Sequence, residues 1–118
     1  MDYEVKQARF TIGQNLSNVV DLGDDVAAIA IGLPGTWTAA NLTFRGCDTA
    51  EGEFTDIHSV DGSAFTVTTA GASRWLVGTT LTETLRPFRY IKIRSGTLAL
   101  PVTQAGDNKV LKVLVKSA

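Results

Sequence analysis

Strict alternation of apolar and polar residues is the feature that most constrains how this chain can fold. In the segment 90–94, two isoleucines alternate with a tyrosine, a lysine and an arginine. Successive side chains of an extended strand point to opposite faces, so the isoleucines predict a buried face and the polar residues an exposed one. The same period of two recurs at 41–45 and at 54–57. The pattern predicts antiparallel sheets that bury one face.

Residues that favour turns divide the sequence into segments of about ten residues. Between the turns the chain is rich in Val, Ile, Phe, Trp and Thr, which are enriched in strands. Many short strands at this spacing are typical of a sandwich or barrel. For 79–85 we expect a loop with one turn of helix at most. The expected turns are 13–15, 23–25, 34–35, 61–62, 70–71, 96 and 106–108, and the expected strands are 5–12, 18–22, 27–32, 41–46, 53–60, 63–69, 74–77, 89–95 and 110–116.

The phase of each strand predicts which side chains form the core. Phe54 and Ile57 are three residues apart, so a bulge near Asp56 would be needed to turn both inward. Asp61 and Gly62 are suited to the two left-handed positions of a type I′ hairpin turn. The expected core comprises Phe10, Ile12, Val20, Ile29, Ile31, Leu42, Phe44, Phe54, Ile57, Phe65, Val67, Trp75, Ile91, Ile93, Leu111, Val113 and Val115.

Size and charge restrict the class of protein. A chain of 118 residues fits one domain, and no internal repeat or linker divides it. The net charge is −1 and the cations are scattered, so we expect no nucleic-acid partner. The acidic start of the sequence does not resemble a signal peptide, no apolar stretch is long enough to span a membrane, and Cys47 is the only cysteine. These features predict a soluble protein made in a reducing cytoplasm.

Two single residues, His58 and Cys47, are candidates for metal binding or catalysis. A zinc site needs several such ligands, and the chain has one histidine. A thiol nucleophile needs a base and an orienting group, and nothing in the sequence supports that arrangement at Cys47. We therefore expect a surface histidine and an inert thiol, although a small hydrolase using both residues stays open. No phosphate loop, Walker motif or serine elbow is present, so we predict no catalytic residues and no cofactor.

Acidic turns and exposed aromatic residues are two further candidates for binding. The acidic turns do not follow the spacing of a calcium loop, so we expect solvent-exposed turns, with a structural calcium ion as the alternative. An aromatic platform could stack against a sugar ring, although aromatic residues of a sandwich mostly pack in the core or at its rim. The acidic residues are Asp21, Asp24, Asp25, Asp48, Glu51 and Glu53, and the platform residues are Trp37, Trp75, Tyr90 and Arg94.

Two segments of the chain resemble small virion proteins of tailed bacteriophages. The first combines Trp-Thr-Ala-Ala-Asn-Leu-Thr-Phe at 37–44 with Gly-Glu-Phe-Thr-Asp-Ile at 52–57 and Asp-Gly at 61–62. The second is Tyr-Ile-Lys-Ile-Arg-Ser-Gly-Thr at 90–97, followed by Pro-Val at 101–102 and Gln-Ala at 104–105. The segment Arg-Tyr-Ile-Lys-Ile-Arg at 89–94 is also similar to a late strand of discoidin-like, galactose-binding jelly rolls. The cysteine pair of extracellular discoidin domains and a clear sugar-contact set are missing here.

These resemblances imply a fold and a function. The implied fold is all-β, a single antiparallel jelly-roll sandwich over 1–118. Independently of the resemblance, we expect 1–8 to form a flexible or docking arm, because terminal residues stay mobile until something ties them down. The implied function is a non-enzymatic decoration or cement protein of the phage head, located on the virion after synthesis in the host cytoplasm. Its partner would be the major capsid protein, and copies could associate, for example as trimers. The alternative is a carbohydrate-binding module of a tail fibre or accessory protein.

Overall fold

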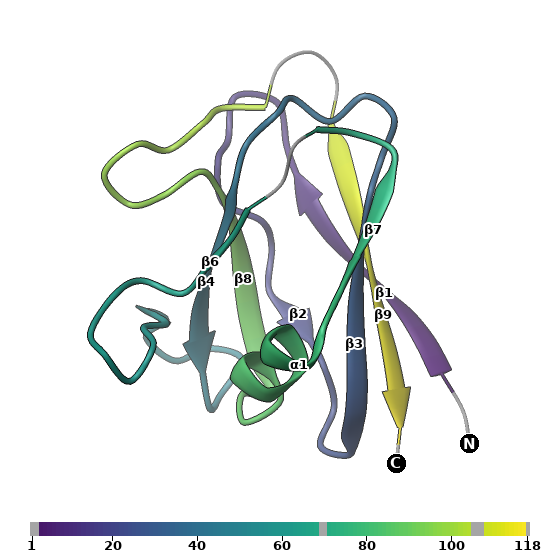
Figure 1. Ribbon diagram of the computed structural model, residues 1–118, viewed down its shortest axis with the longest axis vertical. Coiled ribbons are helices and arrows are strands. Elements are labelled where there is room, and N and C mark those ends of the chain that lie inside the picture. The colour runs from purple at the N-terminus through teal and green to yellow at the C-terminus, as the bar shows by residue number, and fades with distance from the viewer. Residues whose placement is uncertain (1–2, 69–70, 105–107, 118) are drawn as a thin grey trace.

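Two antiparallel sheets pack face to face in the computed structural model, which describes residues 3–68, 71–104 and 108–117 (Figure 1). Each of the nine predicted strand segments overlaps one observed strand. The first sheet has the order β1 (Tyr3–Phe10), β9 (Lys109–Ser117), β3 (Val26–Leu33) and β7 (Arg74–Val77). The second has the order β2 (Val20–Asp21), β8 (Tyr90–Ser95), β4 (Leu42–Cys47) and β5 (Thr55–Asp56), with β6 (Thr66–Val67) also paired to β4.

The strand order is that of a jelly roll. Along the chain, β1, β2, β3 and β4 alternate between the two sheets, and β7, β8 and β9 alternate again. Each sheet therefore interleaves strands from both halves of the chain, as in the double-sheet jelly rolls. The predicted all-β sandwich is confirmed. Among the described residues, no helix has the length and apolar character needed to cross a membrane.

One hydrophobic core fills the space between the sheets. Phe44 and Ile93, which the alternation placed inward, are both fully buried and face each other across the β4–β8 register. Phe44 also contacts Phe65, with ring centroids 5.7 Å apart, and Phe10 meets the edge of Trp37 at 5.4 Å. These contacts join side chains from both sheets and from the loops into one cluster.

Two predicted core residues, Ile12 and Trp75, lie outside the core, so that part of the prediction is wrong. Ile12 is 66% exposed because β1 ends at Phe10 and the alternation does not continue past it. Trp75 is 52% exposed because Leu76 supplies the half-buried position of β7. Trp75 pairs with Gly32 of β3, and its ring lies against the glycine, where an added Cβ would come within 3.0 Å of it.

The prediction for Phe54 is correct on burial and wrong on its location. Phe54 is buried beneath Lys92, whose Nζ lies 4.9 Å from the ring centroid, and it does not belong to the main core cluster. Ile57 does belong to that cluster. Phe54 and Ile57 therefore face opposite sides, as uninterrupted alternation requires, and the register around Asp56 needs no bulge.

The hairpin at 59–63 forms with a different turn from the predicted type I′. Gly62 has φ +92°, whereas Asp61 is not among the residues with positive φ. The Gly62 N–H donates to the Ser59 carbonyl at 2.9 Å, and the Ser59 N–H donates to the Ser63 carbonyl at 2.8 Å. This is a three-residue loop, a turn followed by one left-handed glycine. The Asp61 carboxylate stabilises it by accepting a hydrogen bond from the Ser63 N–H at 2.9 Å.

Two further expectations need correction. The segment Thr79–Leu85 forms a seven-residue α-helix, α1, which lies across one end of the sandwich (Figure 1). Its leucines, four residues apart, are both buried, and Thr82 Oγ1 accepts a hydrogen bond from the Ile29 N–H at 3.1 Å. The flexible arm is wrong for residues 3–8, which pair with β9. Parts of four expected elements lie outside the described residues. They are residues 1–2 of the arm, residue 69 of the expected strand 63–69, residue 70 of the expected turn 70–71 and residues 106–107 of the expected turn 106–108.

Candidate functional site

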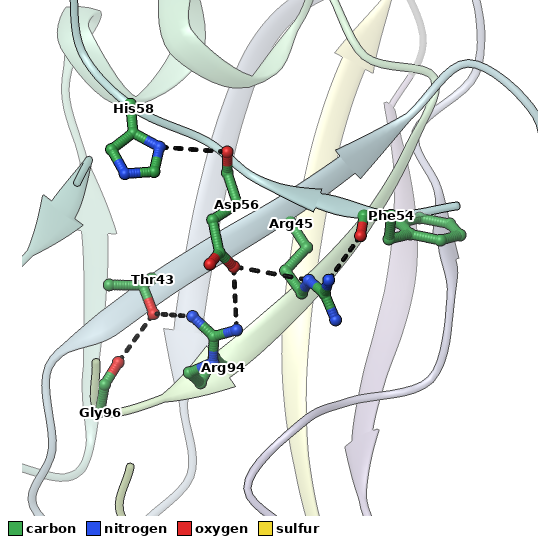
Figure 2. Close-up of polar contacts among 7 residues, drawn as sticks. All are labelled: Thr43, Arg45, Phe54, Asp56, His58, Arg94 and Gly96. Atoms are coloured by element: carbon green, nitrogen blue, oxygen red, sulfur yellow. Dashed lines mark hydrogen bonds and ion pairs between the residues drawn. The ribbon is translucent and has the colours of Figure 1, made fainter. Parts of the chain in front are cut away.

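A polar cluster lies on the outer face of the second sheet, where one aspartate meets two arginines (Figure 2). The β-ladder places it there, because Arg94 of β8 pairs with Thr43 of β4, and Arg45 of β4 pairs with Asp56 of β5. Asp56 Oδ1 accepts a hydrogen bond from Arg94 Nη2 at 2.9 Å and forms an ion pair with Arg45 Nε at 3.4 Å. One carboxylate is therefore shared by two guanidinium groups.

The remaining contacts of the cluster tie its arginines to the backbone. Arg94 Nη1 donates to Thr43 Oγ1 at 3.4 Å, and the Thr43 hydroxyl donates to the Gly96 carbonyl at 2.8 Å. Arg45 Nη2 donates to the carbonyl of Phe54, as Figure 2 shows. These bonds connect β4, β5 and β8 with the segment that follows β8. The charged groups of the cluster are bonded to one another and to the backbone. This arrangement is suited to stabilising the sheet and its loops more than to proton transfer.

A second buried group holds the loop after β8. Gln104 is buried, and its Oε1 accepts a hydrogen bond from the Thr38 N–H at 2.8 Å. Its Nε2 donates to the Thr38 carbonyl at 3.0 Å and to Ser95 Oγ at 2.8 Å. The segment 96–104 is thereby fixed at both ends, because Gly96 and Gln104 are each bonded to other parts of the chain.

An apolar cavity of about 380 Å³ lies beside the polar cluster. Ile57, Leu98 and Ala99 line it together with His58 and Arg94. His58 is exposed, and its Nδ1 lies 3.3 Å from the carbonyl oxygen of Asp56. The guanidinium of Arg94 and the carboxylate of Asp56, which also lines the cavity, are already paired with each other, so this charge pair does not select a ligand.

His58 and Cys47 are not brought together. His58 follows Ile57, whose N–H donates to the Phe44 carbonyl near the start of β4, whereas Cys47 ends β4 opposite Tyr90. Phe44 and Cys47 are three positions apart on the strand, a distance of about 10 Å at the usual rise. Cys47 is buried, and its sulfur contacts Asp48 and Thr49. The structure therefore does not assemble the arrangement that a cysteine hydrolase would need.

The acidic turns do not converge on a metal position. In the described residues, no three histidine, cysteine, aspartate or glutamate side chains are grouped so that they could hold an ion. Asp21 instead bonds Arg89, with Oδ1 3.1 Å from Nε and Oδ2 3.4 Å from Nη2. This guanidinium is the main reason why the pKa of Asp21 lies below its ordinary value of 3.8.

The four residues of the expected aromatic platform are dispersed. Trp37 is in the core, and its indole N–H has no hydrogen-bond acceptor among the described residues. Trp75 lies on the first sheet, whereas Tyr90 and Arg94 lie on the second. Trp75 alone remains an exposed ring, and it borders a depression of about 350 Å³ that Pro34 and Lys112 also line.

The outer face of the first sheet carries an apolar surface that the sequence reasoning missed. The strand registers place Val5, Leu114, Ala30 and Val77 side by side across β1, β9, β3 and β7. These four residues are called the outer apolar row below. Val5 and Val77 are exposed, and Leu114 and Ala30 are half-buried. The continuous apolar run 113–115 was the available signal, because it leaves one apolar residue on the solvent face of β9.

Charged and aromatic residues border this row. In β9, Lys112 and Lys116 lie two positions to either side of Leu114, on the same face and exposed. Trp75 lies two positions from Val77 on the same face of β7. The outer face of the first sheet therefore combines an apolar row, an exposed indole and two lysines.

Comparison with known proteins assigns no family to this chain, because it matches no protein-family model, no curated protein and no solved structure.

Proposed function

We propose that this chain is a non-catalytic structural protein of a bacteriophage particle, which binds the major capsid protein of the head and reinforces the shell. The outer face of the first sheet is the observation that carries the proposal. It presents the outer apolar row with Trp75 on one side and lysines on both sides. A broad, exposed apolar surface rimmed by polar groups is typical of a protein-binding surface.

The resemblance of 37–62 and 90–105 to small phage virion proteins gives the partner. Jelly rolls occur in viral capsid proteins and also in lectins, so the fold alone agrees with more than one function. The polar cluster around Asp56 and the Gln104 contacts support a structural role, because they fix the loops to the sheets. A rigid surface loses little conformational freedom when it docks.

Reinforcement follows from mass action. A protein that binds the assembled shell and not the free capsid subunits stabilises the shell by its binding free energy. Many copies on one head multiply that effect. We assign the outer apolar row to the contact with the capsid, and Lys112 and Lys116 to acidic groups around that contact.

The direct test mixes the purified protein with heads assembled without it, sediments the heads, and then heats them. We expect the protein to sediment with the heads and to raise the temperature at which they release DNA. Val77→Glu places a charge in the outer apolar row at an exposed site, so it should abolish sedimentation without unfolding the protein. Val60→Glu is the matched control, because Val60 is also an exposed valine, and it lies in the 59–63 hairpin of the second sheet.

The outcomes separate the function from the surface. If wild-type protein neither sediments with the heads nor raises the release temperature, the proposed function is wrong. If Val60→Glu abolishes binding and Val77→Glu does not, the function stands and the assigned surface is wrong. A folded Cys47→Ser/His58→Ala variant should bind as the wild type does, because neither side chain belongs to the outer face of the first sheet.

Carbohydrate binding is the second candidate, and the exposure of Trp75 is the observation that favours it. Its ring lies against Gly32 and is bordered by Pro34 and Lys112, so a sugar ring could stack on its exposed side. A glycan array tests this function directly. Binding that is lost in Trp75→Ala and kept in Val77→Glu would favour a sugar ligand over the capsid.

A further inference from the structure

The outer edge of β1 is open over part of its length. One edge of β1 pairs with β9 from Tyr3 to Phe10. On the other edge, the Asn18 N–H donates to the Arg9 carbonyl at 3.2 Å, and the Arg9 N–H donates to Asn18 Oδ1 at 2.6 Å. Backbone groups alternate between the two edges of a strand, so the N–H and C=O groups of Gln7, Val5 and Tyr3 point the same way as those of Arg9.

No hydrogen bond reaches the outer backbone groups of Tyr3, Val5 or Gln7 from any residue in the described ranges. Natural proteins usually blunt such an edge with proline, a bulge or an inward charge. The β1–β9 register is continuous, and the segment contains no proline. In the open segment 3–7, Glu4 and Lys6 lie on the core-facing side of the strand, but they pair with each other at 2.8 Å, so this segment carries no unpaired inward charge. The edge is therefore suited to pairing with another strand.

We propose that a second copy of this chain pairs with the open edge, β1 against β1 in antiparallel orientation, with a two-fold axis at Val5. Val5 then pairs with the partner's Val5, and Tyr3 with the partner's Gln7. Each of these pairs exchanges both backbone hydrogen bonds, because its outer groups all point toward the partner. The two copies share one continuous sheet.

The charges select this register. With the axis at Val5, Glu4 lies opposite the partner's Lys6, and Lys6 lies opposite the partner's Glu4. An axis at Glu4 would place the two glutamates opposite each other, and an axis at Lys6 would do the same with the lysines. Like charges that are directly opposite destabilise a strand pair, whereas opposite charges stabilise it.

The position of Asn18 selects the same register independently. Asn18 closes the edge at Arg9, so the open segment runs from Tyr3 to Gln7. Only an axis at Val5, the middle residue of that segment, pairs the whole open segment with its copy. An axis at Lys6 would bring Tyr3 opposite the partner's Arg9, whose backbone groups are already used by Asn18.

This pairing also extends the outer apolar row. Val5 is the last residue of the row, on β1. The rows of the two copies therefore meet at the two-fold axis and form one continuous row across the first sheets of both copies. The inference does not depend on the proposed function. A dimer would, however, double any surface that the outer face of the first sheet presents to a partner.

Sedimentation equilibrium across a dilution series tests the proposal. We expect the wild-type protein to reach twice the 12.6 kDa mass of one chain. Glu4→Lys and Lys6→Glu should each weaken dimerisation by about tenfold, because each places two like-charged pairs across the axis. An equimolar mixture of these two variants should dimerise again, because every pair across the axis then has opposite charges. The ion pair within one strand cannot explain this rescue.

A proline variant supplies the second test. The Val5 N–H points to the open edge and makes no bond to β9, so Val5→Pro removes only the bond to the partner. We expect this variant to be monomeric with a cooperative thermal transition. The proposal is overturned if the wild type stays at the mass of one chain at every concentration or reaches that of three. It is overturned equally if the mixture of charge variants stays monomeric, or if folded Val5→Pro dimerises like the wild type.

Discussion

Two of the arginine–aspartate pairs among the described residues have similar lengths but differ in burial, and this difference leads to a quantitative prediction. The Arg94–Asp56 pair has an N–O distance of 2.9 Å, and its side chains are 8% and 20% exposed. The Arg89–Asp21 pair has an N–O distance of 3.1 Å, and its side chains are 47% and 46% exposed. Both pairs join an arginine to an aspartate, so a difference in how much each pair stabilises the fold reflects its degree of burial.

The expected magnitude follows from what each substitution leaves behind. Asp56→Ala leaves the nearly buried Arg94 guanidinium without its carboxylate, and breaking a buried pair in this way costs about 3–5 kcal/mol. Because Asp56 is partly exposed, we expect a loss near the lower end of that range. Arg94→Met should cost about 2 kcal/mol, since it removes a hydrogen bond to a charged group while Asp56 keeps its contact with Arg45.

The assay is a double-mutant cycle measured by urea denaturation. Asp56→Ala, Arg94→Met and the double variant should give a coupling energy of about 1.5–2 kcal/mol, typical of residues in one network. The same cycle at Asp21 and Arg89 is the matched control, and its coupling should be much smaller because solvent screens an exposed pair. Independent sites add to within about 0.5 kcal/mol. A coupling energy between Arg94 and Asp56 below that value would refute the role of the cluster in stabilising the sheet. Equal coupling at the two pairs would refute the argument from burial.

Four further substitutions test the core, two turns and the pH dependence. Phe44→Ala should cost about 3–5 kcal/mol in denaturant titration, because the ring is fully buried, and a loss below about 1 kcal/mol would contradict its place in the core. Gly96→Ala should cost about 2–4 kcal/mol, since φ is +87° and the new Cβ would meet backbone of 100–102 within 3.0 Å. Gly62→Ala, where φ is +92° and nothing lies within 4 Å, should cost only about 1 kcal/mol, and equal losses would disprove the clash. The arginine beside Asp21 lowers its folded pKa below 3.8, so the pair stabilises the fold above that pH and its contribution is lost as pH falls through the folded pKa. Asp21→Asn should therefore lower the melting temperature slightly at neutral pH and have no such effect in acid.

The sequence predicts which face of a strand is buried better than it predicts which strands and side chains lie next to each other. Alternation identified Phe44 and Ile93 as buried because a strand alternates whatever its partners are. It failed at Ile12, where the strand had already ended, and at Trp75, where a glycine on the neighbouring strand accepts a large ring on the solvent side. Neither cause can be read from the local pattern.

The same limit explains the candidate sites. Arg94 and Asp56 are distant in the sequence and meet because β4 lies between their strands. Register and strand order are not determined by alternation, so this pairing could not be predicted. The outer apolar row is a similar case, since its four residues come from four strands. The α1 helix could have been predicted, because Leu81 and Leu85 have the spacing of one helical face. The threonines around them, which favour strands, obscured this signal.

The central position of β9 in the first sheet has a kinetic consequence. β9 pairs with β1 on one side and β3 on the other, and it follows all other strands in the sequence. Strands β1 and β3 therefore cannot join into the complete first sheet until β9 has been synthesised. Contacts between such distant segments slow folding, because a long loop must close before they form.

An incomplete chain on the ribosome can pair β2, β8 and β4 before it can complete the opposing sheet. During that interval β1 and β3 have edges with no partner strand, and unpaired edges of this kind promote aggregation. Strand β9 thus acts as the closing step of folding, and its arrival ends the period in which the nascent chain is most vulnerable.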